Sequence, residues 1–136
     1  MISAASSRVS GLFGTGPETV AVELDDALTV LKNERRRHLV RHVATMDADE
    51  TVDARELAHY VGAREWGKSP AEIHRPSTKS VYVALVSTHL EKLAAVGVVR
   101  YDSDRKVISP GPAVDVFAEY LAESEQRFQT AEEGSA

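Results

Sequence analysis

Apolar and polar residues alternate at helical spacing over most of the chain, and the clearest case runs from residue 78 to residue 96. At 100° per residue, this stretch gathers its large apolar side chains on one side and its small or polar side chains on the other. Gly97 then ends the helix, because glycine readily adopts the left-handed conformation found after helix ends. The pattern predicts a helix with a buried back and a free face. That free face carries Ser80, Ala84, Ser87, Thr88 and Glu91.

Three shorter helices are predicted before it. Apolar residues recur at i, i+3, i+4 and i+7 from Leu24 to Leu31, which predicts a first helix. Asn33 is a typical N-cap residue and predicts a second helix that ends near Thr45. Asp53 opens a sequence that resembles a capping box, so we expect a third helix that ends near Trp66.

Two polar residues fall on apolar helix sides. Arg36 lies on the inward side of the second helix, and a buried arginine needs a partner for its charge, so we expect a carboxylate beside it. His89 lies in the middle of the apolar side of residues 78–96. A hydrogen-bonded core histidine is far more common there than a catalytic base, and we expect His89 to tie its helix to neighbouring backbone.

A β-hairpin is predicted directly after Gly97. Residues 98–101 and 106–109 are rich in β-branched side chains, and a polar turn joins them. Thr51 and Val52 are suited to one more, very short strand. The sheet content is therefore expected to be small.

The last predicted helix follows Pro110-Gly111-Pro112 and carries apolar residues at near-heptad spacing. We expect this apolar stripe to pair with the same helix of a second copy, as in two-fold symmetric dimers. The alternative is that the helix folds back along its own domain and buries Val114, Phe117 and Leu121 internally. The residues expected at the dimer contact are Val114, Phe117, Tyr120, Leu121 and Phe128.

The chain of 136 residues is long enough for one hydrophobic core but not for two. We expect a flexible leader over residues 1–22, a folded domain over 23–110, a dimerisation helix over 111–129 and a disordered tail over 130–136. No apolar run approaches the ~20 residues that span a bilayer, and the first residues lack the apolar stretch of a secretory signal. No membrane contact and a cytoplasmic location are therefore expected.

The order of helix, glycine and strand, with HLEKLAAVGVV at its centre, resembles the end of the recognition helix and the first wing strand of winged helix-turn-helix regulators of the arsenical-repressor type. The resemblance covers roughly Leu24 to Ser109. A haloarchaeal family of uncharacterised winged-helix domains is closer still, because it is similar to three segments of this chain in the same order. These segments are RRRHLVRHV (Arg35–Val43), ELAHYVGAREW (Glu56–Trp66) and VYVALVSTHLEKLAAVGVV (Val81–Val99).

The resemblance implies a mainly α fold with a small β-hairpin wing, that is, a winged helix-turn-helix with a C-terminal dimerisation helix. It also implies a DNA-binding transcriptional regulator from a haloarchaeal or haloarchaeal-virus setting, with residues 78–96 as recognition helix and 98–109 as wing. The formal charge of −5 argues against nucleic acid, since DNA-binding domains are usually basic. In a high-salt cytoplasm the Debye length falls to about 3 Å or less, so repulsion by distant carboxylates is largely screened.

A DNA interface of this kind needs a helix whose free face reaches base edges, with cations on both sides to hold phosphates. The free face here has no Arg, Asn or Gln for bidentate base contacts, so base recognition should be loose. Two alternatives stay open. In the first, the cations are solvated and pair with nearby carboxylates, and each such surface ion pair contributes ~0–1 kcal/mol to stability. In the second, the same fold binds another protein through this face. The residues expected at DNA are Arg37, Arg41, Arg75, Lys79, Ser80, Ser87, Thr88, Lys92, Arg100, Arg105 and Lys106.

Catalytic, cofactor and metal sites are not expected. The chain has no cysteine, which removes thiol catalysis and thiolate metal sites. His38 and His42 have a spacing that suits one metal ion, but HLVRH lacks the central Glu of a zinc-protease helix and Arg41 would oppose a cation. GLFGTG (Gly11–Gly16) lacks the Lys-Ser/Thr that completes a phosphate loop. We therefore expect no enzyme activity.

Overall fold

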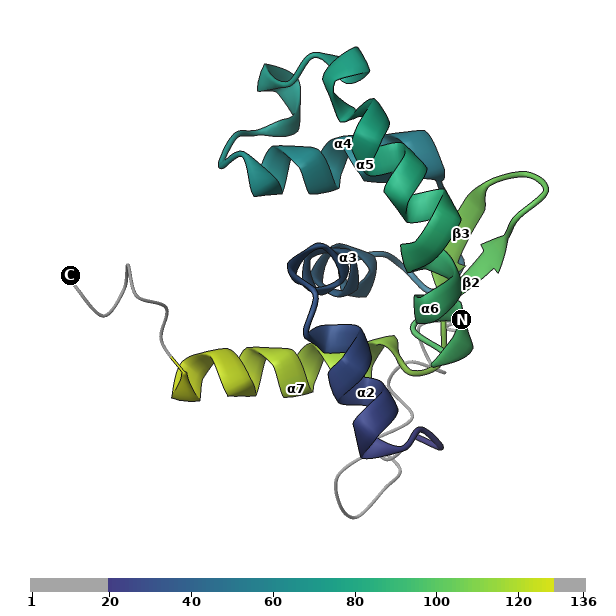
Figure 1. Ribbon diagram of the computed structural model, residues 1–136. Coiled ribbons are helices and arrows are strands. Elements are labelled where there is room, and N and C mark those ends of the chain that lie inside the picture. Colours follow the sequence, from purple (N-terminus) through teal and green to yellow (C-terminus); the bar gives the residue numbers. More distant parts are fainter. Residues whose placement is uncertain (1–19, 129–136) are drawn as a thin grey trace.

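The computed structural model describes residues 20–128, except for the side chains of Arg75 and Pro76. The described part is mainly helical and holds a small antiparallel sheet (Figure 1). Within it, none of the helices combines the length and the apolar character that crossing a membrane requires. The elements are α2 (Leu24–Leu31), α3 (Glu34–Ala44), β1 (Val52–Asp53), α4 (Ala54–Glu65), η2 (Pro70–Glu72), η3 (Arg75–Thr78), α5 (Lys79–Ala84), η4 (Leu85–His89), α6 (Leu90–Ala95), β2 (Val99–Asp102), β3 (Val107–Pro110) and α7 (Val114–Arg127).

Side-chain caps start α3 and α4 where the sequence predicts them. The Asn33 side chain accepts a hydrogen bond from the backbone N–H of Arg36 at 3.1 Å. The Asp53 carboxylate accepts one from the backbone N–H of Glu56 at 2.8 Å. Each cap satisfies a backbone donor that has no partner inside the helix, so both helix starts are fixed locally.

The predicted helix over residues 78–96 is formed by α5, η4 and α6 in succession. Its middle, η4, is a stretch of wider π-type helix, which the sequence pattern did not predict. The helix ends before Gly97, which has φ of +84°, a conformation that glycine adopts without a steric penalty. The prediction of a helix that stops at this glycine is confirmed.

The sheet has the strand order β1-β3-β2, and both pairs are antiparallel. The predicted hairpin is β2 and β3, in which Tyr101 pairs with Ile108. The short strand expected near Val52 is also present, and Val52 pairs with Ile108 from the other side. The backbone N–H of Ala54 donates to the Lys106 carbonyl at 2.9 Å, so the start of α4 is tied to the hairpin.

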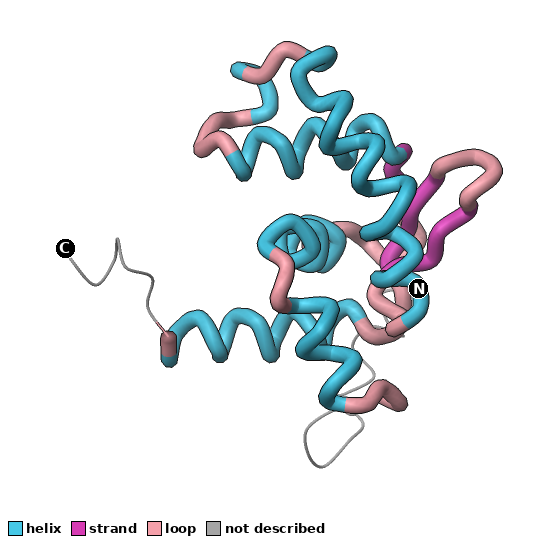
Figure 2. Tube along the Cα trace, viewed as in Figure 1, coloured by secondary structure: helices cyan, strands magenta, loops and turns pink. Residues whose placement is uncertain are grey.

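Helix α3 lies at the centre of the fold, with α4 and α5 on one side of it and α2 and α7 on the other (Figure 1). Leu39, Val40 and Val43 of this helix are fully buried, as is Ile108 of the sheet. The hairpin projects at one side of the molecule, away from the free end of α7 (Figure 2). One core thus joins all the main elements.

Helix α7 packs along α3 of the same chain, so the alternative expectation for it is correct. Val114, Phe117 and Leu121 are buried in the core, where they cover the side of α3 that faces away from α4. Of the residues expected at a dimer contact, only Tyr120 and Phe128 are exposed, to 44% and 77%. The expectation that the whole apolar stripe is left for a second copy is wrong, because α3 needs apolar cover on both sides.

Candidate nucleic-acid interface

The helix formed by α5, η4 and α6 turns its polar side to solvent. Ser80, Ser87 and Thr88 are exposed, as the sequence predicts. Leu85 and Leu93 on the opposite side are fully buried. The result is a helix with a rigid apolar back and an outer face of small hydroxyl side chains. Lys79 and Lys92 are also exposed on this helix, together with Glu91.

His89 and Arg36 fix the back of this helix to the core. The Arg36 guanidinium donates through Nη1 to His89 Nδ1 at 3.1 Å. It also donates through Nε to the Val30 carbonyl at 2.8 Å and through Nη2 to the Thr29 carbonyl at 3.1 Å. These carbonyls belong to the last turn of α2, the negative end of the helix dipole, which favours a cation. The expected carboxylate partner of Arg36 is therefore wrong: backbone carbonyls and an imidazole take its place.

The His89 imidazole is neutral at physiological pH. Burial, and then the charge of the neighbouring Arg36, lower the pKa of His89 from 6.5 to about 4. Since Arg36 can only donate, Nδ1 of His89 is the acceptor and its hydrogen lies on Nε2. The expectation of a hydrogen-bonded core histidine is confirmed, although its partner is a side chain and not the backbone.

The hairpin presents three cations beside the helix. The backbone N–H groups of Asp104 and Arg105 both donate to the Asp102 carboxylate, which shapes the turn. Lys106, at φ of +59°, donates its ammonium to the Ser103 carbonyl, and Arg100 donates to the Pro110 carbonyl. The exposed Arg105 guanidinium has no hydrogen-bond or ion-pair partner among residues 20–128. Arg105 is therefore the hairpin cation most available to an anionic partner.

Two of the predicted phosphate contacts lie elsewhere. Arg37 donates to the Leu31 carbonyl at 2.8 Å, and so holds the end of α2. Arg41 pairs with Glu125 of α7 and donates to His38 Nδ1 at 3.2 Å. The structure does not bring these two arginines to the outer face of α5 and α6, because Arg37 is held at the end of α2 and Arg41 is held by α7. The Arg75 side chain lies outside what the structure describes.

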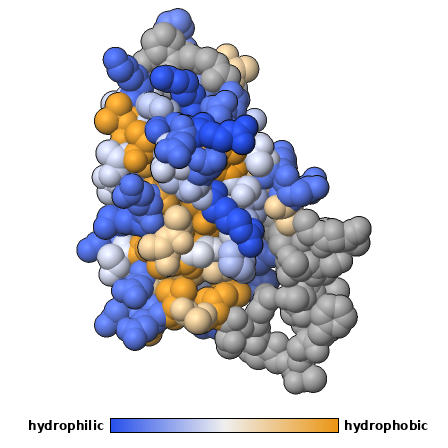
Figure 3. Space-filling view, turned by 90° about the vertical axis from the view of Figure 1, so that its right-hand side faces the viewer, coloured by the Kyte–Doolittle hydropathy of each residue, from blue (hydrophilic) through white to orange (hydrophobic). Residues whose placement is uncertain are grey.

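Positive charge is concentrated in this part of the chain. Residues 78–110 contain five Lys or Arg and three Asp or Glu, a formal charge of +2, whereas the whole chain has −5. Figure 3 looks onto the side that carries the hairpin, where hydrophilic residues cover much of the surface and smaller hydrophobic areas lie among them. The acidic character of the chain therefore does not extend to the helix and hairpin.

The structure places one further cation, Arg55, near this helix. The Arg55 guanidinium, from the first turn of α4, lies 4.4 Å from the centre of the Tyr82 ring of α5. A cation over an aromatic face is held in place by the ring quadrupole. The sequence pattern places Arg55 on the outer side of its own helix. Its contact with α5 depends on how α4 and α5 pack against each other, which the pattern does not contain.

Comparison with known proteins identifies the family of the chain but not its activity. No curated protein and no solved structure matches this sequence. One family model does match, over residues 28–109, which is more than half of the chain and runs from before α3 to the last residue but one of β3. The chain therefore belongs to the family described as Domain of unknown function (DUF7344).

Proposed function

We propose that this chain is a DNA-binding transcriptional regulator with a winged helix-turn-helix domain, and that it acts as a homodimer in a haloarchaeal or haloarchaeal-virus cytoplasm. In this proposal α4 and the helix from α5 to α6 form the helix-turn-helix, and β2 with β3 forms the wing. One observation carries it: a helix with a buried back and a hydroxyl-rich outer face lies beside a hairpin whose turn exposes Arg105. This pairing suits a helix in the major groove and a hairpin on the backbone.

The side chains available favour affinity over sequence selectivity. Lys79, Lys92 and Arg105 are exposed and can approach phosphates on both sides of the outer face. Ser87 and Thr88 are short, so they allow the helix backbone to come close to a groove, but each offers only a single hydroxyl. We therefore expect modest discrimination between base sequences.

High salt makes the local charge more important than the total charge. At molar ionic strength the Debye length is about 3 Å, so only contacts at close range contribute. The formal charge of +2 over residues 78–110 supports phosphate contact under these conditions, although the whole chain is acidic.

The second candidate is a protein-interaction module on the same scaffold. Val83 of α5 is 50% exposed. The free face of this helix, formed by Ser80, Ala84, Ser87, Thr88 and Glu91, offers no Arg, Asn or Gln side chain for base contacts. A face that combines one exposed apolar side chain with short hydroxyl side chains can also pack against a protein surface.

The test is binding of the folded chain to a labelled DNA duplex, measured by fluorescence anisotropy at low and at high salt. In the variant with Arg105→Glu and Lys106→Glu, we expect affinity to fall by about tenfold or more, because two phosphate contacts become repulsive. A control variant with Lys32→Glu and Arg127→Glu changes the net charge equally, on exposed positions outside the helix and hairpin. It should bind as the unmodified chain does.

Equal losses in both variants would reduce the effect to overall charge and contradict the wing contact. If the unmodified chain binds no duplex, the protein-interaction module is favoured. Immunoprecipitation of the tagged protein at native salt gives an independent check, because a regulator should be enriched at discrete promoters.

A further inference from the structure

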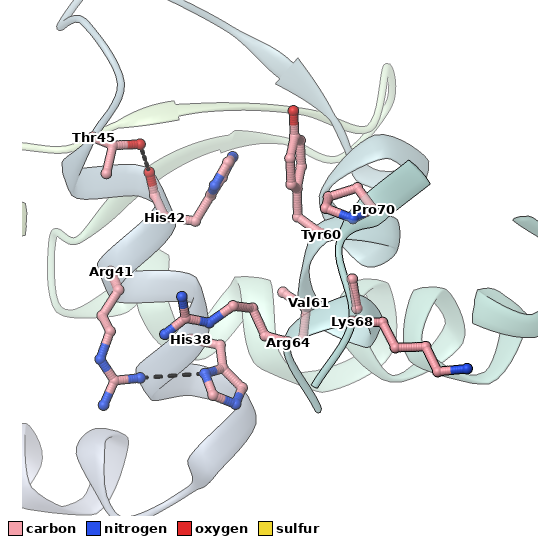
Figure 4. Close-up of a pocket in the computed structure, with 10 residues that line it drawn as sticks. His38, Arg41, His42, Thr45, Tyr60, Val61, Arg64, Lys68 and Pro70 are labelled. Atoms are coloured by element: carbon pink, nitrogen blue, oxygen red, sulfur yellow. Dashed lines mark hydrogen bonds between the residues drawn. The ribbon is translucent and has the colours of Figure 1, made fainter. Parts of the chain in front are cut away.

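A cavity of about 280 Å³ lies between α3 and α4, away from the helix and hairpin discussed above. Residues of α3 and α4 form most of its wall, and Thr45, Lys68 and Pro70, the first residue of η2, complete it (Figure 4). No residue of α5, α6, β2 or β3 lines it. Whatever this cavity binds is therefore separate from a partner on the outer face of α5 and α6.

One end of the cavity is lined by two arginines. Arg41 comes from α3 and Arg64 from α4, and Figure 4 shows the Arg64 guanidinium extending toward Arg41 and His38, whereas Lys68 points away from them. Burial, followed by the nearby charges of Arg64 and Arg37, lowers the pKa of Arg41. Arg41 is half-buried and already paired with Glu125, whereas Arg64 is exposed and has no anionic partner within residues 20–128. Like charges repel, so an anion placed between the two guanidinium groups would be attracted by both.

The cations of this end have spare hydrogen-bonding capacity. A guanidinium has five N–H donors. Arg41 uses one toward His38 Nδ1 and one toward Glu125, and the guanidinium of Arg64 has no hydrogen bond or ion pair within the described part of the chain. His38 adds no positive charge of its own near pH 7, because burial and the charge of Arg41 lower its pKa. Two guanidinium groups can thus share one anionic head group.

The other end of the cavity is flat and mostly apolar. The His42 ring stacks on the Tyr60 ring, with centroids 4.3 Å apart and planes at 28°. Burial lowers the pKa of His42, so the imidazole stays neutral near pH 7. Val61, Ala63 and Pro70 extend this surface.

We propose that this cavity binds a small organic anion, with its carboxylate or phosphate group between Arg41 and Arg64 and its apolar part near the stacked His42 and Tyr60 rings. Its volume suits a ligand on the order of ten non-hydrogen atoms, at roughly 30 Å³ for each water-sized group. Small ligand sites commonly combine an apolar wall with a few placed polar groups, as this one does.

The ion pair between Arg41 and Glu125 links the cavity to α7. An anion at Arg41 competes with the Glu125 carboxylate for the same donors and is repelled by its charge. Removal of that charge should therefore strengthen anion binding, whereas removal of the Arg64 charge should weaken it. The opposite signs distinguish a specific site from general loss of folding.

The test is isothermal titration calorimetry of the complete chain with phenyl phosphate, at about 0.1 M salt and without DNA. Binding to the Arg64→Gln variant should be about tenfold weaker or more, the usual loss for a charged hydrogen-bond partner. Binding to the Glu125→Gln variant should be about two- to fivefold tighter. The control is Lys32→Gln, which also removes one positive charge, at an exposed position after α2 that does not line the cavity, and it should leave the affinity for phenyl phosphate unchanged.

Inorganic phosphate and phenol represent the two halves of the probe and should each bind more weakly than phenyl phosphate. Equal affinities of the Arg64→Gln and Lys32→Gln variants would overturn the proposal, as would phenol or inorganic phosphate binding as tightly as phenyl phosphate. No heat of binding to the unmodified chain would also overturn it. Since DNA is absent, none of these results depends on the proposed regulator function.

Discussion

Arg36 is only 5% exposed, yet its charge is satisfied without a carboxylate. Its guanidinium donates hydrogen bonds to the Thr29 and Val30 carbonyls and to the His89 imidazole. These bonds join α2, α3 and the end of η4. A guanidinium suits this task because its donors form a rigid fork, which a lysine ammonium does not provide. One residue thus positions the helix that carries the proposed interface.

The low pKa of His89 predicts a loss of stability in acid. In the unfolded chain the imidazole has a pKa near 6.5, whereas in the folded chain it is about 4. Between these pH values the unfolded chain binds the proton more readily, so the contribution of His89 to the free energy of unfolding falls as the pH falls. It reaches a loss of about 3 kcal/mol at most near pH 4. The measurement is urea denaturation of the unmodified chain and of His89→Asn from pH 7 to pH 4.

The asparagine oxygen can still accept from Arg36 but does not titrate. His38 and His42, whose pKa values are also lowered, remain in both proteins, so the difference between the two curves reports His89 alone. The variant should lose less stability in acid than the unmodified chain. Parallel curves would show that the protonation of His89 is not linked to folding.

For single residues, the sequence predicted whether a side chain is buried or exposed better than it predicted the residue that the side chain contacts. The helical pattern correctly placed Ser80, Ser87 and Thr88 outside and His89 inside. It also placed Arg41 on the outer side of α3, but in the folded protein that side chain contacts α7. The pattern does not contain the position of α7, whose Glu125 pairs with Arg41, because that depends on contacts between residues 84 positions apart.

The elements were predictable where their ends are encoded locally. Asn33, Asp53 and Gly97 mark helix boundaries through their own side chains or backbone conformation, and all three boundaries are confirmed. The packing partner of α7 was not predictable. A near-heptad stripe indicates that one side of a helix is apolar, but a core of the same chain and a second copy satisfy that side equally well.

The segment after α6 and the segment before α7 are joined by backbone hydrogen bonds. The backbone N–H of Gly111 donates to the Val98 carbonyl at 2.8 Å, and that of Ala113 donates to the Gly97 carbonyl at 2.9 Å. A Cβ atom at Gly111 would lie 2.2 Å from the Gly97 carbonyl oxygen, far inside any real contact. This crossing sets the position of the hairpin relative to α7.

Substitution of Gly111 by alanine should therefore destabilise the fold by about 2–4 kcal/mol, since the backbone must shift to admit one methyl group. Chemical denaturation measures the effect. The control is Pro112→Ala at the adjacent exposed position, which should cost under about 1 kcal/mol through greater freedom of the unfolded chain. Similar losses for both variants would refute the close crossing.

Over the described part of the molecule, several of the exposed large apolar side chains lie on α2 and α7. A groove between these helices is lined mainly by aliphatic residues, from Val20 to Leu31 and from Val116 to Tyr120. Leu24 and Leu28 of α2 are exposed together with Tyr120 of α7. Self-association of the proposed regulator is therefore expected through this face, and not through the buried stripe of α7.

The Tyr120→Glu substitution should prevent this association, because it places a charge in the centre of an apolar contact. Sedimentation or light scattering should give twice the chain mass of 14.8 kDa for the unmodified protein and the single mass for the variant. The control Val83→Glu changes an exposed apolar residue on α5 and should remain dimeric. An unmodified chain that stays monomeric at high concentration would contradict the homodimer.

The boundaries of the family match and of the hydrophobic core do not coincide. The match ends at residue 109, whereas Val114, Phe117 and Leu121 belong to the core. A fragment trimmed to residues 28–109 would retain all three strands but strip α3 of the cover that α7 provides. Such a fragment would expose a broad apolar surface and aggregate, so recombinant fragments of this protein should extend through Arg127.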